Sequence, residues 1–363
     1  MRGGRYAGFV VVVTAVVLLA GCSPTPTAPT VDVKSSVSAT PKFCARLVAN
    51  SAGLDDRALN QSSWRGLQAA KKVDDIDIDS NTASPPENAT PKLVEAVESR
   101  CPLIVTVGKE LAEATRTQAL ANPGLHFTIV DHAVEAPNVR SVEFDTSQVA
   151  FLAGYLSAYM SKTKIVAIFG DTSEPRVAST MDGFARGVAK YNEIHRGIAV
   201  VRGWDPASRA GVFTGVINDP VAAKSASKAT AKALLDAGAD VILPIVGQAG
   251  VGAAEAVREK RNCLLVWDGS DGYETLAAEF RPILLTSIVK KADDAIANIV
   301  TDANAGVFSP LPYRGTLANL GVTLAPPHSL EPDVPPELSA EIEQLRAQLI
   351  AAPAVAGPLS AVQ

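Results

Sequence analysis

The sequence has few of the residues that metal centres and hydrolytic active sites require. Its 363 residues include four His and four Cys, and aromatic residues make up 5% of the chain. No two His stand four residues apart and no CxxC occurs, so the spacings that zinc sites favour are missing. No GxSxG occurs either, and no base can be assigned to a Ser or Cys nucleophile. We therefore expect no metal, no other cofactor and no enzymatic activity.

The sequence also lacks an excess of positive charge. Its 33 Lys and Arg face 38 Asp and Glu, which gives a net charge of −5. Nucleic-acid binding needs clustered cations, so we expect no nucleic-acid partner. With 47% hydrophobic and 20% charged residues, the chain is too apolar for disorder and too charged for a polytopic membrane protein. At about 150 residues per domain, its length indicates two domains.

The N-terminus has the form of a secretion signal. Arg2 and Arg5 precede an apolar run over 9–20, and these 12 residues are too few to span a bilayer. The run ends in Leu19-Ala20-Gly21-Cys22, which resembles the bacterial lipobox, where the Cys takes a diacylglycerol before cleavage. The alternative is an ordinary secretory signal followed by a chance Cys. We expect residues 1–21 to be removed and acylated Cys22, with palmitate among its chains, to anchor the protein on the outer face of the cell membrane.

A polar segment follows the expected anchor. Twelve of the 19 residues at 23–41 are Pro, Ser or Thr. Such a composition cannot bury apolar surface, so residues 22–41 are interpreted as a tether. The compartment outside the membrane also permits disulfides.

From residue 42 on, short apolar segments alternate with amphipathic ones. The segment 103–107 is apolar nearly throughout, as in a parallel strand that is covered on both faces. The alternation predicts doubly wound parallel sheets with right-handed crossovers, and the number of strands indicates two sheets. Strands are expected at 43–49, 103–107, 125–131, 139–144, 164–170, 197–203, 240–246, 262–268 and 283–289. Helices are expected at 60–72, 91–99, 109–121, 147–161, 180–192, 222–237, 250–260 and 291–304.

Polar residues and glycines follow several of these strands. Ligands of doubly wound sheets bind beyond the carboxyl ends of the strands, where a Gly lets the backbone approach and a carboxylate can accept from hydroxyls. Asp131 and Gly247 stand at two such ends, and Asp268 and Asp271 at a third. A single Asp after a strand more often caps the next helix, so the set carries more weight than any one member.

The order of several short motifs resembles the basic membrane protein family, the lipoprotein substrate-binding proteins of ABC importers. Residues 55–66, Asp-Asp-Arg-Ala-Leu-Asn-Gln-Ser-Ser-Trp-Arg-Gly, match a family pattern near D-x-S-F-N-x-x-x-W-x-G. The resemblance covers about 42–328. Its further matches are Leu103 to Gly108, Asn122-Pro123 leading to Asp131, Ala150 to Tyr155, Met181 to Phe184, Gly238 to Ile242, Thr286 to Lys291, and Gly321-Val322 in a late hairpin.

This resemblance implies a type I periplasmic-binding fold. Two α/β lobes would be joined by a three-strand hinge and would close on a ligand. On this map the chain crosses between lobes near Asp145, near Asp271 and near Tyr313. The expected parts are lobe one at 42–145 plus 272–312, lobe two at 146–271 plus 313–350, and a C-terminal tail at 351–363.

The resemblance also implies a ligand site between the lobes. In the purine-nucleoside branch of the family, two aromatic rings sandwich the base, while carboxylates and a lysine hold the ribose and the base edges. The residues that we carry over or place there are Asp56, Asn60, Asp131, Trp204 as a stacking ring, Gly247, Asp268 or Asp271, and Lys290. Leu59 replaces the family's first aromatic residue, so one face of the base would meet an aliphatic side chain.

The function implied is that of a lipid-anchored, non-enzymatic receptor that delivers a nucleoside to an ABC permease and its ATPase. We expect a monomer. One alternative is a sensory receptor that signals to a membrane kinase or chemoreceptor, and another is a binding protein for a different ligand, such as a sugar. A cell-envelope hydrolase or adhesin is a further alternative, but the hydrolase would need a nucleophile and base that the sequence does not offer.

Three cysteines remain after Cys22. Cys44 opens the first expected strand and Cys101 immediately precedes the next. Adjacent parallel strands would bring these two close enough for a disulfide; the alternative is two buried thiols. Cys263 begins a strand of the second lobe and is expected to be buried and free.

Overall fold

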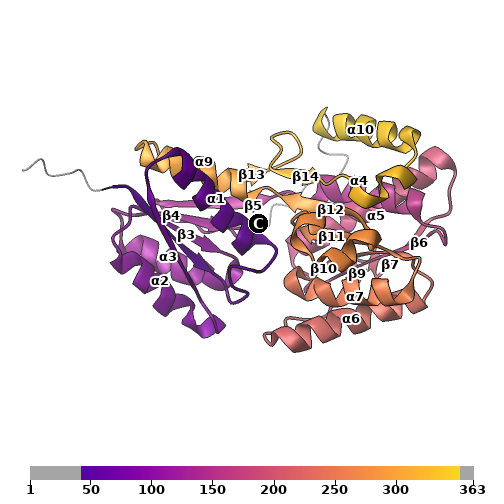
Figure 1. Ribbon diagram of the computed structural model, residues 1–363, viewed down its shortest axis with the longest axis horizontal. Helices are drawn as coiled ribbons and strands as arrows, with labels where there is room; N and C mark the ends of the chain where they lie inside the picture. Colours follow the sequence, from indigo (N-terminus) through magenta and orange to yellow (C-terminus); the bar gives the residue numbers. More distant parts are fainter. Residues whose placement is uncertain (1–41, 352–363) are drawn as a thin grey trace, which may run out of the picture. The chain divides into compact units, whose positions relative to one another are not determined.

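The computed structural model describes residues 42–351. The predicted signal peptide, Cys22 and the tether lie outside the described residues, as does the tail from 352 on. Two six-stranded sheets dominate the described part, each covered by helices (Figure 1). This confirms the predicted fold class, an α/β protein with two doubly wound, mainly parallel sheets.

The first sheet has the strand order β13-β5-β4-β3-β1-β2, and all of its neighbouring strands are parallel. Its strands are β1 (Cys44–Ala49), β2 (Asp77–Thr82), β3 (Leu103–Val107), β4 (His126–Val130), β5 (Val139–Phe144) and β13 (Tyr313–Gly315). The edge strand β2 was not expected: its register pairs Cys44 with Asp77, and alternate acidic side chains give it no apolar pattern.

The second sheet has the order β14-β12-β11-β10-β6-β7, in which only β14 runs antiparallel to its neighbour. Its strands are β6 (Ile165–Gly170), β7 (Val200–Arg202), β10 (Val241–Ile245), β11 (Leu264–Gly269), β12 (Leu284–Lys290) and β14 (Val322–Leu324). A small antiparallel ribbon is formed by β8 (Trp204–Asp205) and β9 (Ala210–Gly211).

Ten α-helices connect or cover the strands within residues 42–351. They are α1 (Leu59–Val73), α2 (Ala89–Glu98), α3 (Ala112–Ala121), α4 (Ser147–Met160), α5 (Pro175–His195), α6 (Pro220–Asp236), α7 (Gly250–Lys260), α8 (Gly272–Thr275), α9 (Ala292–Asn304) and α10 (Pro336–Ala351). Short 3-10 helices are η1 (Pro86–Asn88), η2 (Lys109–Leu111), η3 (Gly247–Ala249), η4 (Ala278–Ile283) and η5 (His328–Asp333).

Apolar side chains point alternately to the two faces of the first sheet, and a hydrophobic core lies on each face. In β1, Leu47 belongs to the cluster that holds Leu67 of α1 and Ile296 of α9. The next residue, Val48, belongs to the cluster that holds Leu93 of α2. Successive side chains of a strand point to opposite faces, so α1 and α9 cover one face and α2 and α3 the other (Figure 1).

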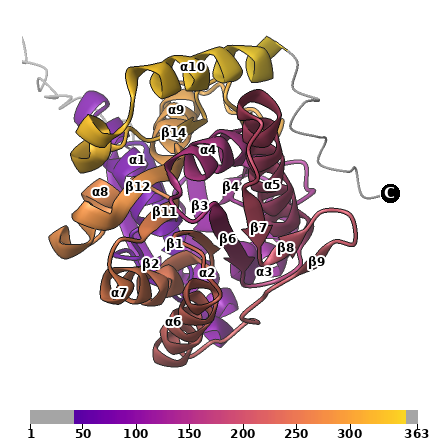
Figure 2. The ribbon, with the colours of Figure 1, turned by 90° about the vertical axis from the view of Figure 1, so that its right-hand side faces the viewer.

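The second sheet follows the same rule. Ile168 of β6 packs in the cluster with Leu152 of α4, whereas its neighbour Phe169 packs with Leu235 of α6 and Val257 of α7. Figure 2 shows α6 and α7 together below the strands, on the side away from α4 and α5.

Glycines allow α4 and α5 to approach backbone to backbone. A Cβ atom on Gly183 would lie 2.2 Å from the Ser147 carbonyl oxygen, and one on Gly187 would lie 1.9 Å from that of Phe151. No larger residue fits at either position without moving a helix. This close contact fixes α5, whose first turn reaches the candidate site described below.

The chain passes between the two sheets three times, but the second passage differs from the expected one. We predicted that 272–312 would join lobe one. Instead, the buried strand β12 pairs with β11, to which it is linked through the short helix α8 and η4. The passage therefore follows Lys290, and α9 then packs on α1, where the Asp293 N–H donates to Ser62 Oγ at 3.1 Å. The first passage follows β5, and the third lies between β13 and β14, which belong to different sheets and form no hairpin.

Two further features bind distant parts of the chain. Cys44 and Cys101 form a disulfide with their Cα atoms 5.0 Å apart, while Cys263 is buried and free. Helix α10 lies beside α4 (Figure 2), and the Gln148 side chain donates to the Leu349 carbonyl at 3.2 Å. Between residues 42 and 351, none of the helices combines the length and apolar character that crossing a membrane requires.

Candidate functional site

Asp131 stands directly after β4, in a backbone conformation that residues other than glycine rarely adopt. Its φ is 62°, in the left-handed region, where Asp is better tolerated than most residues. Its N–H donates to the Val142 carbonyl of the neighbouring strand β5 at 2.7 Å, which holds the turn in place. Strained residues of this kind concentrate at functional sites.

The Asp131 carboxylate is paired with Lys290, the last residue of β12. Lys290 Nζ donates to both carboxylate oxygens at 3.1 Å. The two side chains are 10% and 3% exposed, so the pair is nearly dry. Burial by itself would raise the pKa of Asp131, but the charges of Lys290 and Arg176 outweigh it and hold the pKa below its ordinary value. Asp131 is therefore ionised at neutral pH, and the pair joins residues from the two sheets.

Asp268 in β11 adds a second carboxylate. Its Oδ1 is buried and has no hydrogen-bond partner among the residues that the structure describes. Burial raises the pKa of Asp268, although the nearby charges of Lys290 and Arg176 oppose the rise. A buried acceptor without a partner lowers the stability of the folded protein, because its hydrogen bonds with water are lost and nothing replaces them. Asp268 is thus suited to accept from a bound molecule.

Arg176, in the first turn of α5, belongs to the same cluster and was not predicted. Its Nε lies 3.7 Å from Asp131 Oδ2. Asp131 is the main cause that raises the pKa of Arg176, with further contributions from Asp268 and Asp171. A cation in the first turn of a helix opposes the helix dipole. An arginine in the first turn of a helix, shortly after β6 and the Asp171 that follows it, was the feature of the sequence that could have indicated this residue.

The cluster of Asp131, Asp268, Lys290 and Arg176 is called here the charged cluster. It gathers side chains from the carboxyl ends of β4, β11 and β12 and from the start of α5. It offers both hydrogen-bond donors and acceptors in a mostly buried setting, which is suited to holding hydroxyl groups. In the described part of the chain, no three His, Cys, Asp or Glu side chains are grouped so that they can hold a metal ion.

Asp56 and Asn60 have structural partners that account for their burial. Asp56 accepts backbone N–H groups of Ala58, Asn60 and Gln61 at 2.9–3.0 Å, which caps the start of α1. The Asn60 amide donates to Asn50 Oδ1 at 2.7 Å and to the Gly53 carbonyl at 3.0 Å. These bonds shape the loop between β1 and α1. The ligand contacts predicted for both residues remain predictions.

Trp204 does not join the charged cluster. It is 5% exposed, its Nε1 donates to Asp182 Oδ1 at 2.9 Å, and its ring meets Phe213 edge to face at 6.3 Å. Trp204 belongs to the same core cluster as Phe184. This placement favours a packing role, the alternative to stacking on a ligand.

The two remaining predicted residues follow β10 and β11. Asp271 accepts the Tyr273 N–H at 3.0 Å as the cap of α8, and its other oxygen lies 2.8 Å from His328 Nε2. Gly247 has a φ of 55°, and a Cβ atom there would meet nothing within 4 Å, so the space beside it is open. Asp271 thus has protein partners, whereas the ligand contact predicted for Gly247 stays a prediction.

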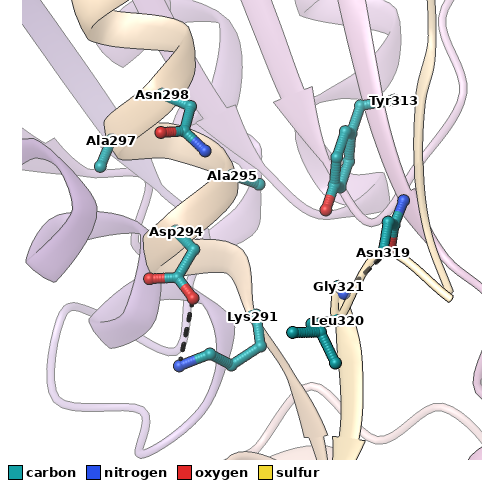
Figure 3. A pocket seen from close by; sticks show the side chains of 9 residues that line it. All are labelled: Lys291, Asp294, Ala295, Ala297, Asn298, Tyr313, Asn319, Leu320 and Gly321. Atoms are coloured by element: carbon teal, nitrogen blue, oxygen red, sulfur yellow. Dashed lines mark hydrogen bonds and ion pairs between the residues drawn. The ribbon is translucent and has the colours of Figure 1, made fainter. Parts of the chain in front are cut away.

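A cavity of about 370 Å³ lies between the α9 region and the segment 313–321 (Figure 3). Lys291, Asp294 and Asn298 of the α9 region line one side, and the ion pair between Lys291 and Asp294 measures 3.3 Å. Tyr313 and the segment 319–321 line the other side. Both sides belong to chain passages between the sheets, and none of the predicted ligand residues lines this cavity.

Comparison with known families and proteins gives a consistent result. The family model described as "ABC transporter substrate-binding protein PnrA-like" matches residues 46–205 and 212–311. The chain is 27% identical over 284 residues to the CD4+ T-cell-stimulating antigen of Listeria monocytogenes, covering 73% of this chain and 75% of that protein. It is also 27% identical over 284 residues to the ABC transporter nucleoside-binding protein BmpA of Lactococcus lactis, with 73% and 76% covered.

Solved structures share the fold. An ABC transporter solute-binding protein of Aeropyrum pernix superposes with a TM-score of 0.72 at 19% identity, over 86% of this chain and 92% of that one. A solute-binding protein of Conexibacter woesei gives a TM-score of 0.65 at 20% identity, over 86% and 97% of the two chains. The family match is interrupted at 206–211, a stretch that holds the turn after β8 and the strand β9.

Proposed function

Because this chain belongs to the PnrA-like family of ABC transporter substrate-binding proteins, we propose that it binds an uncharged ligand rich in hydroxyl groups, a nucleoside, at the charged cluster. Proteins of this family bind solutes for import and are not enzymes. Their function implies an ABC permease and its ATPase as partners. The ligand occupies the space beyond the strand ends that carry Asp131, Asp268 and Lys290.

The single observation that carries this proposal is the unsatisfied Asp268 Oδ1, which lies near enough to Asp131 and Lys290 for their charges to act on its carboxyl. Asp131 already has a donor, whereas Asp268 has none within residues 42–351. A ligand hydroxyl or N–H that donates to Asp268 would restore the bond that this atom lost on burial. Charge-assisted hydrogen bonds to ionised groups are about twice as strong as neutral ones.

Two observations support a nucleoside. The Lactococcus relative is named for nucleoside binding and matches most of this chain. The polar groups of the charged cluster also suit the hydroxyls of a ribose. At Leu59 the base would meet an aliphatic, partly buried side chain in place of the family's aromatic ring, which gives up part of the stacking energy of about 1–3 kcal/mol per base.

Thermal unfolding of the full chain with a panel of nucleosides, bases and sugars tests the proposal. A ligand that binds only the folded protein raises the melting temperature as its concentration rises. We expect ribonucleosides to raise it and free bases to have a smaller effect. If sugars raise it and nucleosides do not, the ligand is a sugar and the nucleoside proposal fails.

The protein acts as a monomer anchored on the outer face of the membrane through acylated Cys22, with the 22–41 tether joining the anchor to the binding lobes. The motif 19–22 and the Pro/Ser/Thr-rich composition support this part of the proposal. Cys22→Ser should release the protein or leave its precursor uncleaved. Mass spectrometry that finds a free N-terminus at another residue of the mature wild-type protein would contradict it.

A further inference from the structure

The guanidinium of Arg176 has hydrogen-bond donors that no residue between 42 and 351 uses. Its contact with Asp131 Oδ2, at 3.7 Å from Nε, is an ion pair that is too long for a hydrogen bond. The side chain is 37% exposed, whereas its partner Asp131 is 10% exposed. Arginine has five N–H donors in a fixed plane, so this group stands at the charged cluster with its donors available.

The position of Arg176 is unfavourable unless something compensates for it. It lies in the first turn of α5, where the helix dipole opposes a positive charge. The carboxylates of Asp131, Asp268 and Asp171 provide that compensation. Glu174, the residue directly before α5, forms an ion pair with Lys109.

The charge balance indicates what Arg176 can bind. Acidic side chains outnumber the two cations Lys290 and Arg176 here, because Asp131, Asp268, Asp171 and Glu174 all act on Arg176. These acids disfavour an anionic ligand, because a further negative charge beside them would be repelled. The acceptor that Arg176 meets is therefore the oxygen of an uncharged group.

We propose that Arg176 is a ligand-binding residue that donates an N–H to a sugar hydroxyl whose own proton goes to Asp131. A hydroxyl accepts and donates at once, so its oxygen can lie within hydrogen-bond distance of both partners while they stay 3.7 Å apart. Lys290 holds the Asp131 carboxylate in place for this contact. The inference rests on the proposed function and adds sugar specificity: Arg176 makes the protein select ribonucleosides over nucleosides that lack one ribose hydroxyl.

Calorimetric titration of the full chain, purified in detergent, tests this with inosine, 2′-deoxyinosine and 3′-deoxyinosine. We expect the wild-type protein to bind inosine at least 10-fold more tightly than one of the two deoxynucleosides. In Arg176→Gln the affinity for inosine should fall at least 10-fold, while the affinity for that deoxynucleoside stays within about two-fold. Arg176→Lys, which keeps the charge and loses the planar set of donors, should lie between the two.

Arg186→Gln is the matched control, because Arg186 is an exposed cation on the same helix. It should leave all three affinities unchanged, and melting temperatures should show that every variant is folded. If Arg176→Gln weakens inosine and the deoxynucleosides equally, or changes none of them, Arg176 does not contact a hydroxyl and the inference is wrong, while the proposed function stands. If the wild-type protein binds no nucleoside, the proposed function and this inference both fail, and the first titration reveals it.

Discussion

Lys290 Nζ lies 3.1 Å from both oxygens of Asp131, although Lys290 ends β12 of the second sheet and Asp131 follows β4 of the first. The pair joins the strand ends of the first and second sheets at the point where the ligand is proposed to bind. It therefore serves two purposes: it places a charged carboxylate for the ligand, and it neutralises a lysine that is 3% exposed. The first prediction follows from the second purpose.

Asp131→Asn should lower the free energy of unfolding by about 3–5 kcal/mol, because it leaves the buried Lys290 without its counter-charge. Urea denaturation of the ligand-free protein measures this. The double variant Asp131→Asn, Lys290→Met is the control and should recover most of the loss, since it removes both charges. A single variant as stable as the wild type would show that the pair is hydrated and structurally neutral.

Trp204→Ala should reduce stability rather than ligand affinity. Removing a buried Trp costs about 3–5 kcal/mol, and here the Asp182 carboxylate also loses a donor. Trp204→Phe keeps the ring packing against Phe213 and should lose less. Chemical denaturation and calorimetry on the folded variants separate the two effects. A large loss of affinity at unchanged stability would restore Trp204 as a stacking ring.

Ligand affinity should fall on acidification through the titration of Asp268. Burial raises the pKa of this carboxyl above its ordinary value of 3.8, and protonation removes acceptor capacity that the ligand needs. The affinity is therefore full above the raised pKa and falls as the pH drops through it. Asp131 keeps its charge over this range, because its pKa lies below the ordinary value. Titrations from pH 7.5 downwards should show the fall in the wild type and not in Asp268→Asn; an identical profile in both would assign it to another group.

The disulfide between Cys44 and Cys101 should contribute about 4 kcal/mol in the chain-entropy treatment, because it closes a loop whose ends are 57 residues apart. Replacing both cysteines by Ser should lower the free energy of unfolding by that order. Thiol counting on denatured, unreduced protein should find Cys263 reactive and neither bridge cysteine. Reaction of all three would contradict the bridge.

The sequence predicted strands and helices where burial leaves a plain pattern. The five residues of β3 are all buried and nearly all apolar, and this strand was expected with its observed bounds. The edge strand β2 was missed because Asp77 and Asp79 give it an acidic, exposed face, and only pairing with β1 defines it. The second passage between the sheets was predicted at the wrong place in the chain. The pairing of β11 with β12 depends on tertiary contacts that no local sequence pattern records.

The residues of the candidate site also fall into those that the sequence indicated and those that only the structure shows. Asp131 was found at a strand end as well as through the family resemblance, Lys290 through the resemblance alone, and the structure brings the two together. Asp56 was indistinguishable in sequence from a ligand residue, because an Asp before a helix caps it whether or not it also binds a ligand. Arg176 was missed because its relation to Asp131 spans 45 positions of the chain and depends on how α5 packs.

Asp268 offers the most direct test of nucleoside binding at the charged cluster, because its Oδ1 has no protein partner in the described residues to lose. The measurement is a calorimetric titration of inosine into the full-length wild-type protein and into Asp268→Asn, with their melting temperatures compared beforehand. We predict saturable binding at one site in the wild type, and at least 10-fold weaker binding in the variant at nearly unchanged stability. Equal affinity in the two proteins, or no binding of any nucleoside to the wild type, would contradict it.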